Sequence, residues 1–218
     1  MSIPVLIIGP SGAGKSASLR NLDPNRVALI NVLGKPLPFK GARRFTSMQT
    51  DNYATVRAAI KKESNRDIIV LDDVGYMMTN QFMRGHADNG SGNERFQFFN
   101  TLADNFWKLI EDAKAVPGDK RIYFIMHEEM NDFGKVKPKT VGKLIDGTVC
   151  IEGMFAICLR ALYLDGKHIF KTQTDGNDVA KSPMGMFESE IIDNDLAAVD
   201  DAIVRYYEID RGAPLLDK

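Results

Sequence analysis

Residues 9–16 read GPSGAGKS and lie between an apolar run and a segment with helical character. The stretch matches the pattern GxxxxGK[ST] in full, in which glycines let successive backbone N–H groups face an anion. The start of the following helix adds the positive end of its dipole. A lysine in this place reaches the β- and γ-phosphates, and the serine holds Mg²⁺. The stretch predicts a nucleoside triphosphate site made by Gly9, Pro10, Ser11, Gly12, Ala13, Gly14, Lys15, Ser16 and Ala17.

The composition is that of an ordinary globular protein. The chain has 218 residues, of which 44% are hydrophobic, with a formal net charge of -1, so a surface that binds nucleic acid has to be local. Two cysteines make a disulfide framework improbable and favour a reducing compartment. Neither a signal peptide nor a membrane span is recognisable, and we expect a single domain over residues 1–218 that resides in the cytoplasm.

Apolar runs and helical spacing alternate along the chain. Strands are expected at residues 3–8, 26–32, 67–71, 121–126, 148–151 and 154–164, and helices at 15–21, 50–63, 94–113 and 196–207. The turn Asp165-Gly166 predicts a hairpin over residues 161–174. Polar loops are expected at residues 79–93 and 131–147. The alternation predicts an α/β fold, with a mainly parallel sheet between helices and an antiparallel hairpin near the C-terminus.

Two adjacent carboxylates follow the third expected strand, IIVL. In sheets of this kind ligands bind at the carboxyl ends of the strands, and in P-loop proteins this is the place of a second contact to Mg²⁺. We therefore expect the carboxylate of Asp72 and the hydroxyl of Ser16 to hold Mg²⁺. Asp73 either polarises the attacking water or caps the turn before Gly75.

The fourth expected strand, RIYFIM, is followed by His127, Glu128 and Glu129. If this strand neighbours the Asp72 strand, His127 lies beside the γ-phosphate and can sense it. The alternative is a neutral histidine that only caps the end of the strand. Glu128 and Glu129 are further candidates for the general base.

Residues 132–143 contain four lysines among twelve residues and form the one clear basic stretch. Such a loop can follow a nucleic-acid backbone, with Phe133 stacking on a base, although a charged run is often only solvated. The expected DNA contacts are Lys135, Lys137, Lys139, Lys143 and, from the other polar loop, Arg84. Lys143, or Lys181 from a polar segment that is otherwise a plain surface loop, could instead act as a trans finger in a neighbouring subunit's ATP site.

Taken together, these segments resemble the phage-encoded, core-only RecA-like ATPases of the AAA-like P-loop group, small proteins tied to single-strand annealing and recombination. The resemblance rests on GPSGAGKS, IIVLDD, FIMHEE, GKVKPKTVGKLI and TDGNDVAKSPMGMFE and covers most of the chain. It implies that Lys15, Ser16 and Asp72 bind Mg-ATP, that His127 is the sensor, and that the two polar loops bind DNA. It also implies the cytoplasm of a host cell and recombination proteins as partners.

One departure from that family concerns the catalytic carboxylate. RecA-like enzymes place a glutamate at the end of an early strand, whereas here the second strand ends in Asn31-Val32-Leu33-Gly34. The residue that activates water therefore stays open among Asp73, Glu128 and Glu129.

The expected function is Mg²⁺-dependent ATP hydrolysis by an oligomer that binds single-stranded DNA. A nucleotide or small-molecule kinase is the first alternative, because the phosphate loop also resembles that of guanylate kinases, but no cluster of arginines for a lid is present. A GTPase lacks support because its Asn-Lys-x-Asp motif is absent. A slowly hydrolysing, ATP-bound assembly module with a protein partner is the third alternative.

Overall fold

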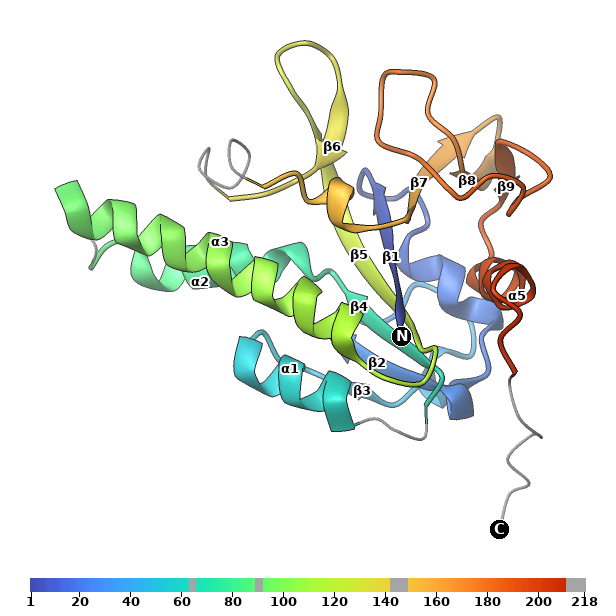
Figure 1. Cartoon of the computed structure of the whole chain (residues 1–218), viewed down its shortest axis with the longest axis horizontal. Helices are drawn as coiled ribbons and strands as arrows, with labels where there is room; N and C mark the ends of the chain where they lie inside the picture. The colour runs from blue at the N-terminus through green and yellow to red at the C-terminus, as the bar shows by residue number, and fades with distance from the viewer. Residues whose placement is uncertain (63–65, 89–91, 142–148, 211–218) are drawn as a thin grey trace.

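The computed structural model describes residues 1–62, 66–88, 92–141 and 149–210, and its centre is a twisted sheet with helices on both faces (Figure 1). The strands are β1 (Ile3–Gly9), β2 (Val27–Asn31), β3 (Ser47–Met48), β4 (Ile68–Asp72), β5 (Arg121–Met130), β6 (Val136–Pro138), β7 (Ile157–Leu164), β8 (Lys167–Lys171) and β9 (Ile191–Asp193). The α-helices are α1 (Tyr53–Lys62), α2 (Gly75–Gly85), α3 (Gly92–Ala115) and α5 (Leu196–Tyr206). Short 3₁₀ helices are η1 (Ser16–Asn21), η2 (Pro24–Arg26), η3 (Ala42–Arg44) and η4 (Glu152–Met154).

The strands of the described residues follow the order β3-β2-β4-β5-β1-β7-β8-β9, and β6 pairs with β5 outside this path. The pairs from β3 to β7 along this order are parallel. The pairs β7–β8, β8–β9 and β5–β6 are antiparallel. This arrangement confirms the predicted α/β fold with its parallel sheet and its C-terminal hairpin. It also inserts β5 between β1, which leads into the phosphate loop, and β4, which ends in Asp72.

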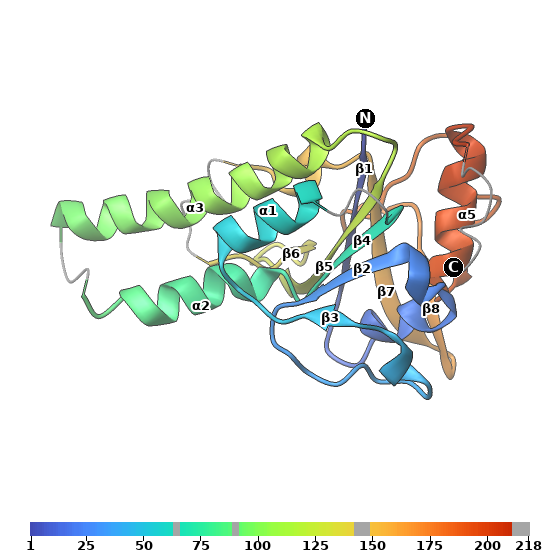
Figure 2. The same cartoon turned by 90° about the horizontal axis from the view of Figure 1, so that it is seen from below.

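The two faces of the sheet bury separate apolar cores, because successive side chains of a strand point to opposite faces. In β1, Leu6 and Ile8 belong to the core beneath α1, α2 and α3, whereas Val5 and Ile7 belong to the core beneath η1 and α5. Figure 2 shows α1 and α3 on one side of the strands and α5 near the other end of the molecule. Strands buried on both faces explain the continuous apolar runs in the sequence.

The predicted polar loop at residues 79–93 is wrong at both ends, because residues 79–85 belong to α2 and residues 92 and 93 begin α3; residues 89–91 lie outside the described residues. Met77 and Met78 are buried against the sheet, and Phe82 stacks with Phe98 and Phe99 of α3. The apolar spacing of this helix begins before residue 79, in residues that the predicted loop did not include. Figure 1 shows α2 and α3 running side by side beyond the sheet.

Smaller differences concern short segments. Residues 149–151 form no strand; they lead into η4, and the next strand begins at Ile157. The helix expected at residues 15–21 is a 3₁₀ helix over residues 16–21. The short strands β3, β6 and β9 carry too few residues for a periodic signal. Among the described residues, no helix combines the length and the apolar character that crossing a membrane requires.

Candidate functional site

The phosphate loop leaves the end of β1 at Gly9 and turns toward η1. Gly12 and Gly14 have φ angles of 81° and 93°, in the left-handed region where side chains are disfavoured. A Cβ atom at Gly9 would lie 2.5 Å from the carbonyl oxygen of Ala161 in β7. Glycine is therefore required at Gly9 by a close approach and at Gly12 and Gly14 by the backbone conformation.

Lys15 lies inside the loop that it follows. Its Nζ donates to the carbonyl oxygens of Gly9 and Pro10, both at 2.8 Å. Burial lowers the pKa of Lys15, while the nearby carboxylates Asp73 and Asp72 act against this shift. The ammonium group is thus held inside the loop, close to two carbonyl oxygens and to the charges of two carboxylates. A lysine in this place of the motif reaches the β- and γ-phosphates of a nucleotide.

Ser16 and Asp72 meet across the gap between η1 and β4. The Ser16 hydroxyl donates to Asp72 Oδ1 at 2.9 Å. Burial raises the pKa of Asp72 to about 6, and the charge of Asp73 adds to this shift. A hydroxyl and a carboxylate are hard oxygen ligands, and Mg²⁺ is commonly held by one or two such protein groups together with phosphate oxygens. The two residues therefore fit the predicted metal site.

Asp73 directs its carboxylate into the site and not onto the start of α2. Its Oδ2 lies 2.6 Å from Lys35 Nζ, and its Oδ1 lies 3.6 Å from His127 Nε2. The N–H of Tyr76 bonds to the backbone carbonyl of Asp73, and no side chain caps α2. Of the two interpretations of Asp73, the capping role is the one that its side-chain contacts do not support.

His127 is aligned with Gly9 in the parallel pair of β5 and β1. The sensor role requires that the strand of His127 neighbours the strand of Asp72, and β5 does pair with β4. Burial lowers the pKa of His127, and the charge of Lys15 lowers it further. The ring also packs edge-on against Tyr76, with centroids 5.8 Å apart. We therefore expect a neutral imidazole at pH 7, which can exchange hydrogen bonds with a phosphate.

The two glutamates after His127 have other partners. Both carboxylate oxygens of Glu128 accept hydrogen bonds of 2.8 Å from Arg160, and Glu129 lies 3.4 Å from Lys137 Nζ. Among the described residues, neither glutamate lines the cavity that follows the phosphate loop, whereas Asp73 does. The geometry leaves Asp73 as the best placed of the three candidates.

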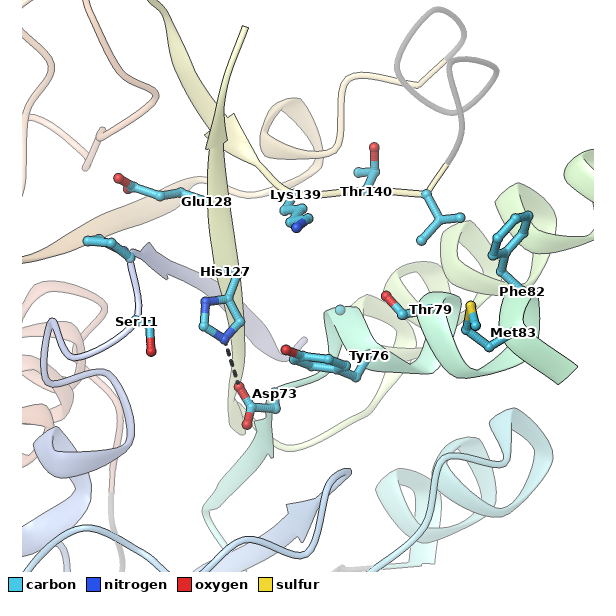
Figure 3. Close-up of a pocket in the computed structure, with 13 residues that line it drawn as sticks. Ser11, Asp73, Tyr76, Thr79, Phe82, Met83, His127, Glu128, Lys139 and Thr140 are labelled. Atoms are coloured by element: carbon cyan, nitrogen blue, oxygen red, sulfur yellow. Dashed lines mark ion pairs between the residues drawn. The ribbon is translucent and has the colours of Figure 1, made fainter.

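Two adjoining cavities surround these groups. One of about 280 Å³ follows the phosphate loop from Ser11 to Ala17. The other, of about 650 Å³, lies between the loop, α2 and the segment after β6. Ser11, Asp73 and His127 line both cavities. Figure 3 shows His127 and Asp73 facing one another, with Tyr76, Thr79 and Phe82 of α2 farther along the larger cavity. A molecule in the larger cavity would thus reach the terminal phosphate.

The predicted DNA contacts lie in different surroundings. Lys135 and Lys139 are exposed, Lys137 pairs with Glu129, and Lys143 lies outside the described residues. Arg84 is on α2, not on a loop, and donates to Asp51 at 2.6 Å. The prediction that Arg84 lies on a loop is therefore wrong, while its contact with DNA stays a prediction.

Lys181, the other predicted trans finger, is tied to the sheet. Its backbone forms a bridge with Cys158, with both hydrogen bonds at 2.8 Å. Cys158 is level with Leu6 in the middle of β1, so this bridge lies below the edge that carries the phosphate loop.

The sequence interpretation missed Lys35 and assigned no structural role to Asn31. The Asn31 side chain accepts from the N–H of Gly34 and donates to the carbonyl of Lys35, which holds the turn that carries this lysine toward Asp73. The hydrogen bond between the Lys35 side chain and Asp73 raises the pKa of Lys35. A lysine in the turn that follows the second strand was the available signal, since all parallel strands end at the same edge.

Comparison with models of protein families matches residues 1–184 to the family described as "AAA domain". No curated protein matches the chain.

Proposed function

The chain belongs to the AAA domain family, and we propose that it is a Mg²⁺-dependent ATPase that binds single-stranded DNA as an oligomer and acts in DNA recombination. Membership of the family implies ATP binding, commonly with Mg²⁺, and an ATPase. The DNA part is carried by one observation: β5 runs without interruption from His127, beside the phosphate loop, into an arm whose tip presents the exposed ring of Phe133.

The ATPase chemistry follows from the geometry of the site. Lys15 neutralises charge on the β- and γ-phosphates, while Ser16 and Asp72 hold Mg²⁺. When bound by Ser16 and Asp72, Mg²⁺ would supply positive charge that stabilises the charge developing on the phosphates. Asp73 orients and deprotonates the attacking water, and Lys35, whose Nζ lies 2.6 Å from Asp73 Oδ2, holds this carboxylate in place. His127 contacts the γ-phosphate and transmits its loss to β5.

The β5–β6 arm, residues 128–138, supplies the proposed DNA contact. Its turn is closed by hydrogen bonds between Asn131 and Lys135, and Phe133 at the tip is 95% exposed. The arm projects from the molecule in Figure 1. An exposed aromatic ring stacks on any base, and the exposed Lys135 beside it can contact a phosphate of the backbone. These features support binding without strong sequence preference.

The experiment measures ATP hydrolysis with and without single-stranded DNA. We expect DNA to raise the rate, Lys15→Ala to abolish it, and Phe133→Ala to remove the stimulation while leaving the basal rate unchanged. Phe96→Ala is the matched control, since Phe96 is an exposed ring on α3 far along the chain from the arm. Hydrolysis that does not respond to DNA would contradict the DNA proposal and leave the ATPase intact.

Self-association is tested by the mass of the particle in solution. We propose that ATP lies between subunits and that Lys143 or Lys181 reaches the neighbouring site. Light scattering with ATP and DNA both present should show an oligomer. A monomer under these conditions would remove the trans finger from the mechanism.

The 650 Å³ cavity favours a second candidate, phosphoryl transfer to a small acceptor. The cavity adjoins the position of the terminal phosphate, where a kinase would hold its second substrate. No arginine lines either cavity among the described residues, which disfavours a phosphorylated acceptor. Transfer of the labelled γ-phosphate of ATP to nucleosides or metabolites in place of water would support this candidate over hydrolysis.

A further inference from the structure

The smaller cavity has two ends, and the strand order keeps them apart. Asp73 and His127, from the ends of β4 and β5, line it on one side, and His168 at the start of β8 lines it on the other. The phosphate loop after β1 lies between them. Asp72 is assigned to Mg²⁺ and Asp73 to the attacking water, so both belong beside the terminal phosphates. The nucleoside would therefore leave the loop on the opposite side, toward His168.

His168 is packed directly against the loop. A Cβ atom on Gly14 would lie 2.9 Å from Nδ1 of His168 and 3.1 Å from Oδ1 of Asn194. The absence of a side chain at Gly14 therefore lets the β7–β8 hairpin approach the phosphate site closely. This close approach makes the imidazole part of the wall that a bound nucleotide would meet.

An exposed aromatic pair continues this wall. Tyr163 and His168 are opposite one another in the β7–β8 pair, with ring centroids 4.8 Å apart and planes at 53°. Tyr163 is 62% exposed, so its ring is accessible to a ligand. Flat rings beside a phosphate loop suit the face of a purine, since base–aromatic stacking does not depend on the hydrogen-bonding edge of the base.

The buried amide of Asn194 lies behind His168. Asn194 is 1% exposed, and neither its Oδ1 nor its Nδ2 has a hydrogen-bond partner among the described residues. A buried amide without partners costs free energy of folding, so a group of this kind in a native structure requires an explanation. Its place at Gly14 and His168 indicates that this wall is shaped for more than packing.

We propose that His168 and Tyr163 form the base-binding wall of the nucleotide site, with the purine ring of ATP stacked on the His168 imidazole. The inference rests on the ATP binding that family membership implies. It adds a side of the site that the phosphate-loop motif does not describe.

The test compares ATP with inorganic tripolyphosphate, which offers the phosphates without the nucleoside. Both ligands are titrated calorimetrically in the presence of Mg²⁺ into the full chain. We expect His168→Ala to weaken ATP binding roughly tenfold and to leave the affinity for tripolyphosphate unchanged. His168→Phe, which keeps a flat ring, should restore ATP binding. His86→Ala, at an exposed histidine of the α2 end, is the matched control and should change neither affinity.

Different failures identify different errors. Equal weakening of both ligands by His168→Ala would mean that His168 only shapes the phosphate loop, and would overturn the inference. Unchanged ATP binding in that variant would overturn it as well. Wild-type protein that bound neither ligand would instead overturn the ATP-binding premise on which the inference rests.

Discussion

Asp73 has a φ angle of 58°, in the left-handed region that few residues other than glycine adopt. Aspartate and asparagine are the residues best able to tolerate this conformation. The turn aims the carboxylate at Lys35 and His127 and away from α2. The backbone conformation is thus part of what makes Asp73 the best candidate to polarise water.

Asp73→Asn tests this role without disturbing the turn. Asparagine keeps the size and tolerates the same φ, but it cannot accept a proton. We expect the rate of ATP hydrolysis to fall roughly 10²- to 10⁴-fold while the affinity for ATP changes little. The measurement is steady-state hydrolysis together with ATP titration.

Glu128→Gln is the comparison variant. Because Glu128 forms an ion pair with Arg160, we expect Glu128→Gln to lower the free energy of unfolding. The rate of ATP hydrolysis should fall much less than in Asp73→Asn. A large loss of hydrolysis in Glu128→Gln with an active Asp73→Asn would exchange the roles assigned to the two carboxylates.

At the scale of elements, a buried ion cluster joins the edge strands to the site. The side chain of Asp178 has no exposed surface. Its Oδ2 lies 3.3 Å from Arg160 Nη1 in β7 and 2.8 Å from Lys171 Nζ in β8. Arg160 also holds Glu128 of β5. Burial alone would raise the pKa of Asp178, but hydrogen bonds from Lys171 and from the N–H of Ala180 outweigh it, so the pKa is lowered. The cluster fixes the segment after β8 onto the sheet.

The lowered pKa of Asp178 predicts an acid-sensitive contribution to stability. A carboxylate whose pKa is lower in the folded than in the unfolded state stabilises the fold above its unfolded pKa, here 3.8, and loses this contribution as the pH falls through its folded pKa. We expect Asp178→Asn to lose roughly 3 kcal/mol of stability at pH 7. The difference from wild type should shrink as the pH falls below about 4.

Urea unfolding of both proteins at several pH values, followed by circular dichroism, measures this difference. Asp175→Asn is the control, because Asp175 contacts the same lysine from an exposed position and surface ion pairs contribute little. A constant difference between wild type and Asp178→Asn from pH 7 to pH 3 would contradict the assignment.

At the scale of the whole molecule, α5 completes one face of the sheet. Leu196, Val199 and Ile203 are fully buried in the core of that face. Asp200 on the same helix accepts hydrogen bonds of 2.8 and 3.0 Å from Arg121 and one of 2.9 Å from Tyr123, both in β5. The family match ends at residue 184, yet the sheet also depends on β9 and α5, which lie beyond that residue.

A chain cut after residue 184 should therefore fail to fold. It loses β9, the apolar face of α5 and the partner of the buried Arg121, each a loss that a sheet of this size does not tolerate. A chain cut after residue 210 keeps all described contacts and is the control. Thermal unfolding followed by circular dichroism distinguishes the two. Cooperative unfolding of the 1–184 chain would show that residues 185–210 are an appendage and not part of the domain predicted over residues 1–218.

Local patterns were sufficient for the phosphate loop, the Asp72 strand, the parallel α/β fold and the hairpin at Asp165-Gly166. Each depends on residues that are neighbours in the chain: a glycine-rich turn between an apolar run and a helical segment, an apolar run that ends in acid, a two-residue turn. Helix α2 escaped because its polar face dominated the composition of the stretch while its apolar face began earlier, at Met77 and Met78.

The tertiary structure alone decided which polar groups share the site. Strand order in a parallel sheet is set by how whole elements pack, so nothing local places β5 between β1 and β4 or brings His168 of β8 to Gly14. The same holds for ion pairs between distant segments. Arg160 forms an ion pair with Glu128, whereas Lys35 and His127 lie against Asp73. The sequence by itself predicted a phosphate-binding loop and its position, because the residues of that motif are contiguous. The positions of Asp73, His127 and His168 around the loop depended on long-range packing.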